Sequence, residues 1–314
     1  MKPLSLPKIA LTLGDPRGIG PEVAAKALND PEVALLADFT VIGPAGILPG
    51  VEVRSVGEWQ KGSSAAEAGR LAGLAVEEAV RMALSGKVAA VVTGPIDKSG
   101  LRQAGYPFSG HTEMLRQLSG ADAVAMMMCA EQTTSGGPLR VVLATTHLPL
   151  RRVSDTLTTH LLVEQTRIAE RGLRTGWGIE SPRIALCGVN PHASDGGLFG
   201  DEEVRIIEPA LAALRAEGVD ATGPLPADTV FVRALREDFD AVIAPYHDVG
   251  MAAFKTASFG RGVNVTLGLP FPRTSPDHGT ALDIAGRGVA EPGSTVQAIR
   301  LAVRLARRFD MARR

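Results

Sequence analysis

Eight short apolar runs alternate along the chain with longer segments in which apolar residues recur at every third or fourth position. The runs are KIALTLG, DFTVIG, VAAVVTG, AVAMMMCA, LRVVLATT, RIALCGV, FDAVIAP and GVNVTLG. Short, continuously apolar runs are typical of strands buried on both faces, whereas spacings of three and four residues are typical of amphipathic helices. The alternation predicts an α/β fold with a wound, largely parallel sheet.

Three segments carry the helical pattern most clearly. The first spans about residues 63–86, where Ser63 or Ser64 can cap the start and Gly86 can end the helix. Its expected buried stripe is Ala68, Leu71, Ala72, Ala75, Ala79 and Met82. The second is expected at about residues 202–217, with an inward face of Val204, Ile207, Leu211 and Leu214. The third follows Ser294, with Val296, Ile299 and Val303 inward.

The stretch AVAMMMCAEQTTSGGPLRVVLATT departs from this alternation, because a glycine-rich turn joins two strand-like runs. Such a pattern predicts an antiparallel hairpin. A hairpin inside an α/β chain indicates a second subdomain. We therefore expect one α/β subdomain made of residues 1–125 and 265–314, and another made of residues 126–264.

Composition narrows the classes of function. Hydrophobic residues make up 45% of the 314 residues and charged residues 21%, as in ordinary globular proteins. The net charge of −1 gives no field that would recruit nucleic acid or an acidic membrane. The amino terminus has no signal-type apolar stretch, no segment reaches membrane-spanning length, and the two cysteines, Cys129 and Cys187, lie in apolar runs. We expect a cytoplasmic protein without nucleic-acid or membrane partners.

Three histidines follow three different apolar runs: His147 in VVLATTHLPL, His192 in IALCGVNPHASDGG and His247 in AVIAPYHDVG. The carboxyl ends of parallel strands line one edge of a sheet, and ligands bind there. Three neutral imidazoles at that edge would form an open metal site, whereas isolated loop histidines are more often plain surface residues. The matching contexts favour a metal-assisted enzyme.

Two loops in the first half are less specific. TLGDPRGIGPE follows a strand and opens a helix at Pro21, but it matches neither the phosphate-loop nor the dinucleotide motif. It is either a plain tight turn or a ligand loop in which Asp15 is the residue of interest. GHTE precedes another helix, so Thr112 is either an N-cap or, with His111, part of an anion site.

The carboxyl-terminal third contains the densest set of polar residues in glycine- and proline-rich context. They are Lys255, Asn264, Arg273 and Asp277. Lysine and arginine together suit a phosphate or a carboxylate, with arginine as a planar fork and lysine as a point charge. The segment PRTSPDHGT has too many turn formers for a helix interior, so a loop is expected there.

Seven separated motifs make the chain recognisable as a whole: GDPRGIGPE, GPIDKSGLRQAGYPFSGHTE, TTHLPL, NPHASDGGLFGDEE, GPLPADTVF, YHDVG and GVNVTLGLPFPRTSPDHGTALDIAGRG. In this order they closely resemble the 4-hydroxythreonine-4-phosphate dehydrogenase family of the vitamin B6 pathway. DHGTALDIAGRGVAEP is also similar to the cofactor loop of isocitrate and isopropylmalate dehydrogenases, and the resemblance implies their fold.

The resemblance implies particular roles. One divalent ion (zinc, magnesium or cobalt) would be bound by His147, His192 and His247. The phosphorylated substrate would be held by His111, Thr112, Lys255, Asn264 and Arg273, with Lys255 or Asp228 as the catalytic base. NAD or NADP would bind at Asp277, His278, Gly279 and Asp283. The family also implies a homodimer with a shared active site. The expected reaction converts 4-phosphohydroxy-L-threonine to a β-keto acid, which decarboxylates to 3-amino-2-oxopropyl phosphate.

The chain departs from the family pattern at four positions. NPHASD, with Ser194 and Asp195, stands where NPHAGE is usual, and YHDVGMAAFK contains Val249 and Ala253 in place of glutamine and proline. NPHAS followed by an acid is similar to relatives that act on aromatic cis-dihydrodiol carboxylates or on other phosphorylated hydroxy acids. Two further classes remain open, a metal hydrolase and a non-catalytic binding protein, although a hydrolase would leave the cofactor-like loop without a purpose.

Overall fold

The chain forms two compact units in a computed structural model that describes residues 6–313. Unit 1 combines the chain up to Asp122 with Val263–Arg314, and unit 2 is Ala123–Gly262. The divisions expected from the hairpin, after residues 125 and 264, lie close to these limits. The first five residues of the amino-terminal stretch lie outside the described part. No helix among the described residues is long and apolar enough to cross a membrane.

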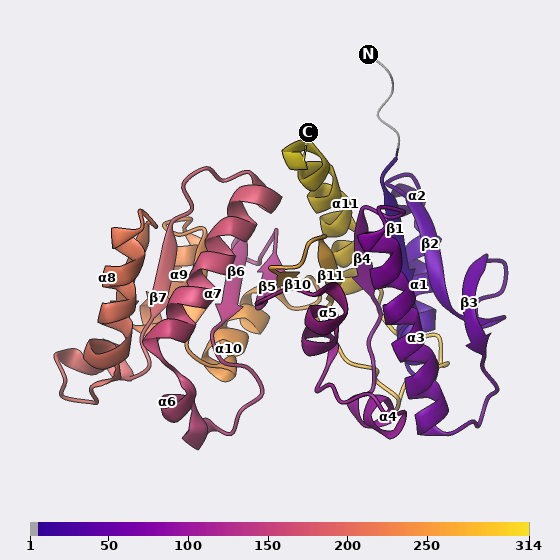
Figure 1. Cartoon of the computed structure of the whole chain (residues 1–314), viewed down its shortest axis with the longest axis horizontal. Helices are drawn as coiled ribbons and strands as arrows, with labels where there is room; N and C mark the ends of the chain where they lie inside the picture. The colour runs from indigo at the N-terminus through magenta and orange to yellow at the C-terminus, as the bar shows by residue number, and fades with distance from the viewer. Residues whose placement is uncertain (1–5, 314) are drawn as a thin grey trace, which may run out of the picture. The chain divides into compact units, whose positions relative to one another are not determined.

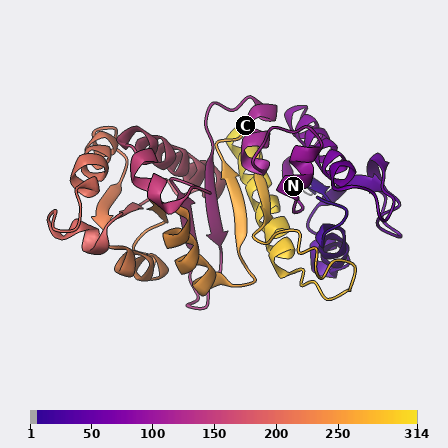
Figure 2. The same cartoon turned by 90° about the horizontal axis from the view of Figure 1, so that it is seen from below.

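Unit 1 is a six-stranded sheet with helices on both faces. Its strands are β1 (Lys8–Thr12), β2 (Asp38–Ala45), β3 (Val53–Glu58), β4 (Ala90–Thr93), β10 (Val263–Leu267) and β11 (Arg273–Pro276), in the order β3-β2-β1-β4-β11-β10. All neighbours are parallel except β10 and β11. Its helices are α1 (Gly20–Leu28), α2 (Pro31–Ala34), α3 (Ala65–Leu84), α4 (Lys98–Gln103), α5 (His111–Ser119) and α11 (Gly293–Arg313). Figure 2 shows α11 in yellow and α3 in purple on opposite faces of these strands.

Unit 2 has a five-stranded sheet in the order β5-β6-β9-β7-β8 (Figure 1). Its strands are β5 (Ala125–Ala130), β6 (Leu139–Leu143), β7 (Ile184–Cys187), β8 (Ala221–Leu225) and β9 (Ala241–Ala244). Its helices are α6 (Val153–Thr156), α7 (Thr159–Gly172), α8 (Glu208–Ala216), α9 (Ala227–Leu235) and α10 (His247–Ser258). Short helical turns occupy Leu150–Arg152, Leu173–Trp177, Pro191–Asp195 and Glu203–Ile207. Helices α9 and α10 contribute Val230, Phe231 and Phe254 to a buried cluster on these strands.

Several sequence predictions are confirmed. The wound, largely parallel α/β sheet is present, and β5 and β6 form the predicted antiparallel hairpin, with Met128 opposite Val141. The Ser64 side chain caps α3 by accepting a hydrogen bond from the Glu67 backbone N–H. All six residues of the expected α3 stripe are buried. In α11, Ile299 and Val303 are buried as expected, while Val296 is half-buried.

Other predictions are wrong for local reasons. The helix expected at about residues 202–217 is present, and Ile207, Leu211 and Leu214 are buried as predicted. Its fourth inward residue is wrong, because a π-helical turn, Glu203–Ile207, changes the residue spacing and leaves Val204 53% exposed. Strands β3 and β8 were not expected. The loop expected at PRTSP contains β11, a fully buried strand that pairs with β4 and β10. Its proline, threonine and serine residues are typical of turns, so the sequence did not predict a strand here. Burial between β4 and β10 outweighs this local propensity.

Candidate functional site

Two of the three strand-end histidines meet in unit 2. His147 follows β6, and His247 begins α10 directly after β9. Because β6 and β9 are neighbouring parallel strands, their carboxyl ends lie side by side. The two imidazole centroids are 5.5 Å apart, with the ring planes inclined by 40°. The strand-end argument therefore holds for this pair.

Hydrogen bonds fix the two loops that carry these rings. The Thr145 hydroxyl donates to the Pro245 carbonyl at 2.8 Å and so ties one loop to the other. Asp248 Oδ1 lies 2.7 Å from His247 Nδ1. Because a carboxylate only accepts, Nδ1 is the donor, and this contact leaves Nε2 as the nitrogen available to a metal ion. A cavity of about 170 Å³ lies here, lined by Thr145, Thr146, His147, Leu148, Leu150, Val153, Tyr246, His247 and Asp248.

The His147–His247 pair fits a divalent ion. With metal–nitrogen bonds of about 2.0–2.1 Å, two imidazoles on one tetrahedral ion have centroids about 5 Å apart, close to the spacing of this pair. Neutral imidazoles are common ligands of zinc and cobalt, and the carboxylate on His247 Nδ1 is the usual partner of a ligating ring. Two ligands leave positions for a third protein ligand and for substrate oxygen.

His192 does not join this pair. It follows β7, which is also parallel to β9, so the strand-end argument locates the start of its loop correctly. The loop then adopts left-handed backbone, with φ of 55° at His192. Within residues 6–313, no group of three or more histidine, cysteine, aspartate or glutamate side chains is arranged to hold a metal ion. His147 and His192 are both exposed.

The two candidate bases lie at different places in unit 2. Lys255 is half-buried on α10, eight residues after His247. Asp228 is exposed in the first turn of α9. Burial raises the pKa of the Cys187 thiol to about 12, and the charges of Glu203 and Asp228 add to the effect. Asp228 therefore lies near the end of β7, on the side of the His192 loop.

In unit 1, Arg273 forms the core of a separate polar site. Its side chain is only 1% exposed, although arginine is rarely buried without a carboxylate. Thr93 Oγ1 accepts from Nη2 at 2.5 Å and from Nε at 3.2 Å, and Thr266 Oγ1 accepts from Nη1 at 2.9 Å. Burial lowers the pKa of Arg273 to about 9, which still leaves the guanidinium cationic at neutral pH. This buried cation is paired with neutral hydroxyls.

Several buried polar atoms of unit 1 have no hydrogen-bond partner among the described residues, and two of them, His111 Nε2 and Asn264 Oδ1, belong to residues expected to bind the substrate. Asn264 lies two residues before Thr266 on β10, so it shares the face of the sheet that holds the Arg273 contact. Burial lowers the pKa of His111 well below its usual range, and the charges of Arg273 and Lys98 add to the effect. The charges of Arg273 and Lys98 beside His111 form a cationic set suited to an anion, whereas Asn264 Oδ1 is an unsatisfied acceptor.

The start of α5 completes this set. Its N-cap is Gly110, and no side chain caps the helix, so the proposed capping role of Thr112 is wrong. Thr112 lies inside the first turn, where backbone N–H groups attract anions. Lys98 was missed by sequence reasoning, because a lysine at a helix start looks like a solvated charge. A methyl group built on Gly110 would lie 3.7 Å from Lys98 Cε, which places the lysine stem over the start of α5.

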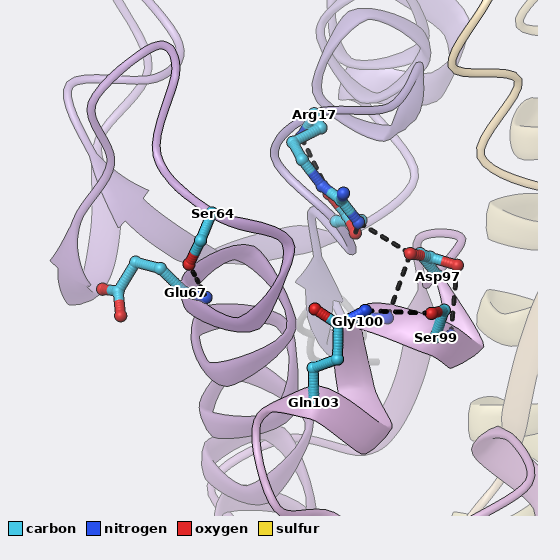
Figure 3. A network of polar contacts seen from close by, with 8 residues as sticks. Arg17, Ser64, Glu67, Asp97, Ser99, Gly100 and Gln103 are labelled. Carbon is cyan, nitrogen blue, oxygen red and sulfur yellow. Dashed lines mark hydrogen bonds and ion pairs between the residues drawn. The ribbon is translucent and has the colours of Figure 1, made fainter.

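The GDPRGIGPE loop has a structural role in unit 1 (Figure 3). Asp15 is fully buried, and its carboxylate accepts from Arg17 Nε and Nη2 at 3.1 and 2.7 Å. Arg17 Nη2 also donates to Asp97 at 2.8 Å, and these contacts, led by the bond to Asp15, raise the pKa of Arg17. Asp97 in turn accepts from the backbone N–H groups of Ser99 and Gly100 and caps α4. The network therefore fixes the segment that carries Lys98.

The cofactor-like loop packs on this same network. Ile19 N–H donates to the Thr280 carbonyl at 2.9 Å, and a methyl group on Gly18 would meet that oxygen at 2.7 Å. The Ser294 hydroxyl accepts from Asp277 N and donates to Asp277 Oδ1, each at 3.0 Å. The polar positions expected to bind cofactor differ in exposure: Asp277 and His278 are half-buried, while Gly279 and Asp283 are exposed.

His278 adds an unsatisfied acceptor to this loop. Its Nδ1 lies 3.0 Å from the Gly279 carbonyl and must donate, so the buried Nε2, which has no partner among the described residues, is an acceptor. Farther along the loop, Glu22 and Lys26 of α1 bind the backbone at Gly288 and Ala290. The loop is therefore anchored at its end, and of the positions expected to bind cofactor, Gly279 and Asp283 are the exposed ones.

The four departures from the family pattern fall into two places. Val249 and Ala253 are half-buried on α10 and pack against the core cluster of unit 2. Ser194 and Asp195 lie in the left-handed loop, with φ of 65° and 46°. The α10 departures are therefore packing residues, whereas the loop departures lie beside His192.

Comparison with known proteins gives a consistent picture. A family model described as "Pyridoxal phosphate biosynthetic protein PdxA" matches residues 22–302. A 4-hydroxythreonine-4-phosphate dehydrogenase of Chromobacterium violaceum is 45% identical over 324 residues, which cover 96% of this chain and 97% of that protein. The crystal structure of the Klebsiella pneumoniae 4-hydroxythreonine-4-phosphate dehydrogenase has a TM-score of 0.82 and 39% identity, covering 96% of this chain and 99% of that chain.

Two more distant structures are also similar. A terephthalate 1,2-cis-dihydrodiol dehydrogenase from Burkholderia xenovorans has a TM-score of 0.66 and 28% identity, covering 95% of this chain and 98% of that one. The isocitrate dehydrogenase of Methylococcus capsulatus has a TM-score of 0.53 and 16% identity, covering 98% of this chain and 88% of that one. The second likeness concerns the fold alone, and it confirms the expected isocitrate dehydrogenase-like architecture.

The buried imidazole of His111 predicts a pH-dependent stability. Because the folded protein holds the pKa of His111 below its usual value, the unfolded chain binds more protons as the pH falls below about 6.5. The free energy of unfolding of the parent protein should therefore fall between about pH 7 and pH 5 more steeply than that of His111→Gln. Urea unfolding at several pH values measures this difference. His160→Gln, at an exposed position on α7, is the control and should keep the parent slope. Equal slopes for the parent and His111→Gln would contradict the prediction.

Proposed function

Since the chain belongs to the PdxA family of pyridoxal phosphate biosynthetic proteins, we propose that it is a metal-dependent 4-hydroxythreonine-4-phosphate dehydrogenase that uses NAD or NADP. The substrate hydroxyl is oxidised to a ketone, hydride passes to the nicotinamide, and a proton is released. The ketone is β to the carboxylate, so carbon dioxide leaves and 3-amino-2-oxopropyl phosphate is formed. This step belongs to pyridoxal 5′-phosphate biosynthesis.

The anion-binding groups of unit 1 are the observation that carries this proposal. A cation as deeply buried as Arg273, with hydroxyl partners, gains most from a ligand of opposite charge. The planar guanidinium offers a fork that matches a phosphate group. His111 and Thr112 add donors and Asn264 adds an amide to the same subsite, and Lys98 adds a point charge. Remote binding of the phosphate then aligns the reacting end of the substrate.

The histidines would hold the divalent ion, which would supply Lewis-acid chemistry at the substrate oxygen. Lys255 or Asp228 accepts the hydroxyl proton. Asp277, His278, Gly279 and Asp283 bind the nicotinamide cofactor and orient it. A cytoplasmic location is supported by Cys129 and Cys187, which are both buried and form no disulfide bond.

One alternative has a specific observation behind it. The dihydrodiol dehydrogenase from Burkholderia xenovorans is 28% identical to this chain. The NPHASD sequence, with Ser194 and Asp195 beside His192, is the feature that favours such a substrate. A dicarboxylate would then take the place of the phosphate at Arg273, because the guanidinium fork matches both anions. The substrate comparison below distinguishes the two.

The proposed reaction predicts that three events occur together. Incubation with 4-phosphohydroxy-L-threonine, either nicotinamide cofactor and a divalent metal should give reduced cofactor and carbon dioxide in equal amounts. Chelation of the metal should abolish both. Absorbance at the reduced-nicotinamide band and trapped carbon dioxide measure the two products, with a cis-dihydrodiol dicarboxylate as the comparison substrate. Turnover of the dihydrodiol alone would favour the alternative, and no reduction with any substrate would contradict the dehydrogenase assignment.

We also propose that the enzyme is a homodimer in which His192 of one copy completes the metal site of the other. His147 and His247 pair within one chain, whereas His192 lies on a separate exposed loop. Large apolar side chains are exposed beside both loops: Leu150 at 69%, Leu198 at 73% and Phe199 at 48%. Exposed apolar residues beside polar ligands are typical of a surface that another protein covers.

Mixed dimers test this arrangement. His147→Ala and His192→Ala should each abolish activity in the homodimer. Co-refolding equal amounts of both variants should restore about one quarter of the parent activity, because half of the dimers are mixed and each has one intact site. A mixture of His147→Ala with His247→Ala is the matched control and should stay inactive. Absence of recovery in the first mixture, with dimers shown by light scattering, would contradict a shared site.

A further inference from the structure

We infer that Glu203 is a positioning residue that holds the His192 loop in the conformation needed for metal binding. The inference rests on the proposed function, because it takes His192 as a metal ligand. Glu203 is not expected to touch the metal, the substrate or the cofactor. It acts through the backbone of Val189 and Asn190, which lead into the loop.

The Glu203 carboxylate is fully engaged with the start of the loop. Its side chain is 1% exposed. Oε1 accepts hydrogen bonds from the backbone N–H groups of Val189 and Asn190, both at 2.8 Å. Oε2 accepts from Asn190 Nδ2 at 2.8 Å. Burial disfavours the charged form, but the hydrogen bonds from Asn190 and Val189 outweigh it and lower the pKa of Glu203. The carboxylate is therefore a charged acceptor at neutral pH.

The loop needs such an anchor because its backbone is strained. His192, Ala193, Ser194 and Asp195 are four consecutive non-glycine residues with φ between 46° and 65°. L-residues avoid this left-handed region because Cβ crowds the following carbonyl, and runs of such residues persist only where the surroundings enforce them. Without the contacts to Val189 and Asn190, the loop would relax and His192 would lose its fixed direction.

The anchor itself is rigid. Glu203 is the first residue of the π-helical turn, and this turn also buries Ile206 and Ile207. The helix continues directly into α8, so the carboxylate is held by a packed element rather than by another loop. A π-helical turn in the middle of a helical segment is often found at functional positions. The π-helical turn that leaves Val204 exposed thus also directs the Glu203 side chain into the interior of unit 2.

Glu202 provides a matched control. It is the neighbouring carboxylate, is half-buried, and accepts only from Asn190 Nδ2, at 2.7 Å. Glu203→Gln keeps the shape of the side chain but places an amide N–H₂ against groups that donate. Glu202→Gln makes the same chemical change without disturbing the two backbone contacts.

The experiment compares metal affinity in the full-length dimeric protein by titration with zinc and cobalt. Glu203→Gln should bind metal about 10- to 100-fold more weakly than the parent, as expected when support of a ligating histidine is lost. Glu202→Gln should stay within about threefold. Thermal unfolding of the metal-free proteins should show that both variants are folded. In a double-mutant cycle, His192→Ala should lose affinity by itself, and adding Glu203→Gln should cause no further loss.

Other results would overturn the inference about Glu203. Parent-like metal binding by Glu203→Gln, or additive losses in the double variant, would overturn the positioning role while leaving the proposed function intact. Parent-like metal binding by His192→Ala would overturn the proposed metal site, and the role of Glu203 with it. If Glu203→Gln does not fold, Asn190→Ala removes the side-chain part of the same anchor. That variant should then show a metal-affinity loss that is absent in the His192→Ala background, and an additive loss would again overturn the inference.

Discussion

Burial of the Arg273 guanidinium is the interaction on which unit 1 depends. A buried charge costs several kcal/mol unless it is paired. Here the partners within the described chain are the hydroxyls of Thr93 and Thr266. Strands β4, β11 and β10 must keep their register to bring these groups together, because Arg273 reaches across to both neighbouring strands. The buried charge therefore favours an anionic ligand, which supports the proposed binding of the substrate phosphate at Arg273.

In unit 2 the candidate site consists of imidazole side chains rather than of a buried cation, and the backbone determines where they lie. The parallel pairing of β6 and β9 is sufficient to bring His147 and His247 together. His192 needs a strained loop and a buried carboxylate at Glu203 to hold its direction. Most of the residues proposed to bind the phosphate and the cofactor belong to unit 1, and the histidines proposed to hold the metal belong to unit 2.

The sequence predicted the structure correctly where one rule, such as the helical repeat or the alignment of parallel strand ends, determines where a residue lies. The stripe of α3 is buried as predicted because the helical period alone determines its inward face. The meeting of His147 and His247 was predicted correctly because both residues follow strands that are parallel neighbours. The strand-end rule could not place His192, because it locates the first residues of a loop and not its later path. Arg273 was expected in a loop, since the burial of β11 depends on contacts with β4, which is distant in sequence, as well as with β10 and α11. Glu203 and Lys98 were missed because an isolated charge in a helical segment looks like a solvated side chain.

The selectivity of the enzyme for phosphate tests the central claim most directly. The measurement is kcat/KM for 4-phosphohydroxy-L-threonine and for 4-hydroxythreonine without phosphate, in the parent protein and in Arg273→Lys. The parent should prefer the phosphorylated substrate by a factor of about 10³ or more, since loss of a charged partner from a buried site costs several kcal/mol. Arg273→Lys should lose most of that preference, because the planar fork is lost while the charge is kept. Equal kcat/KM values for the two substrates in the parent protein would contradict the account.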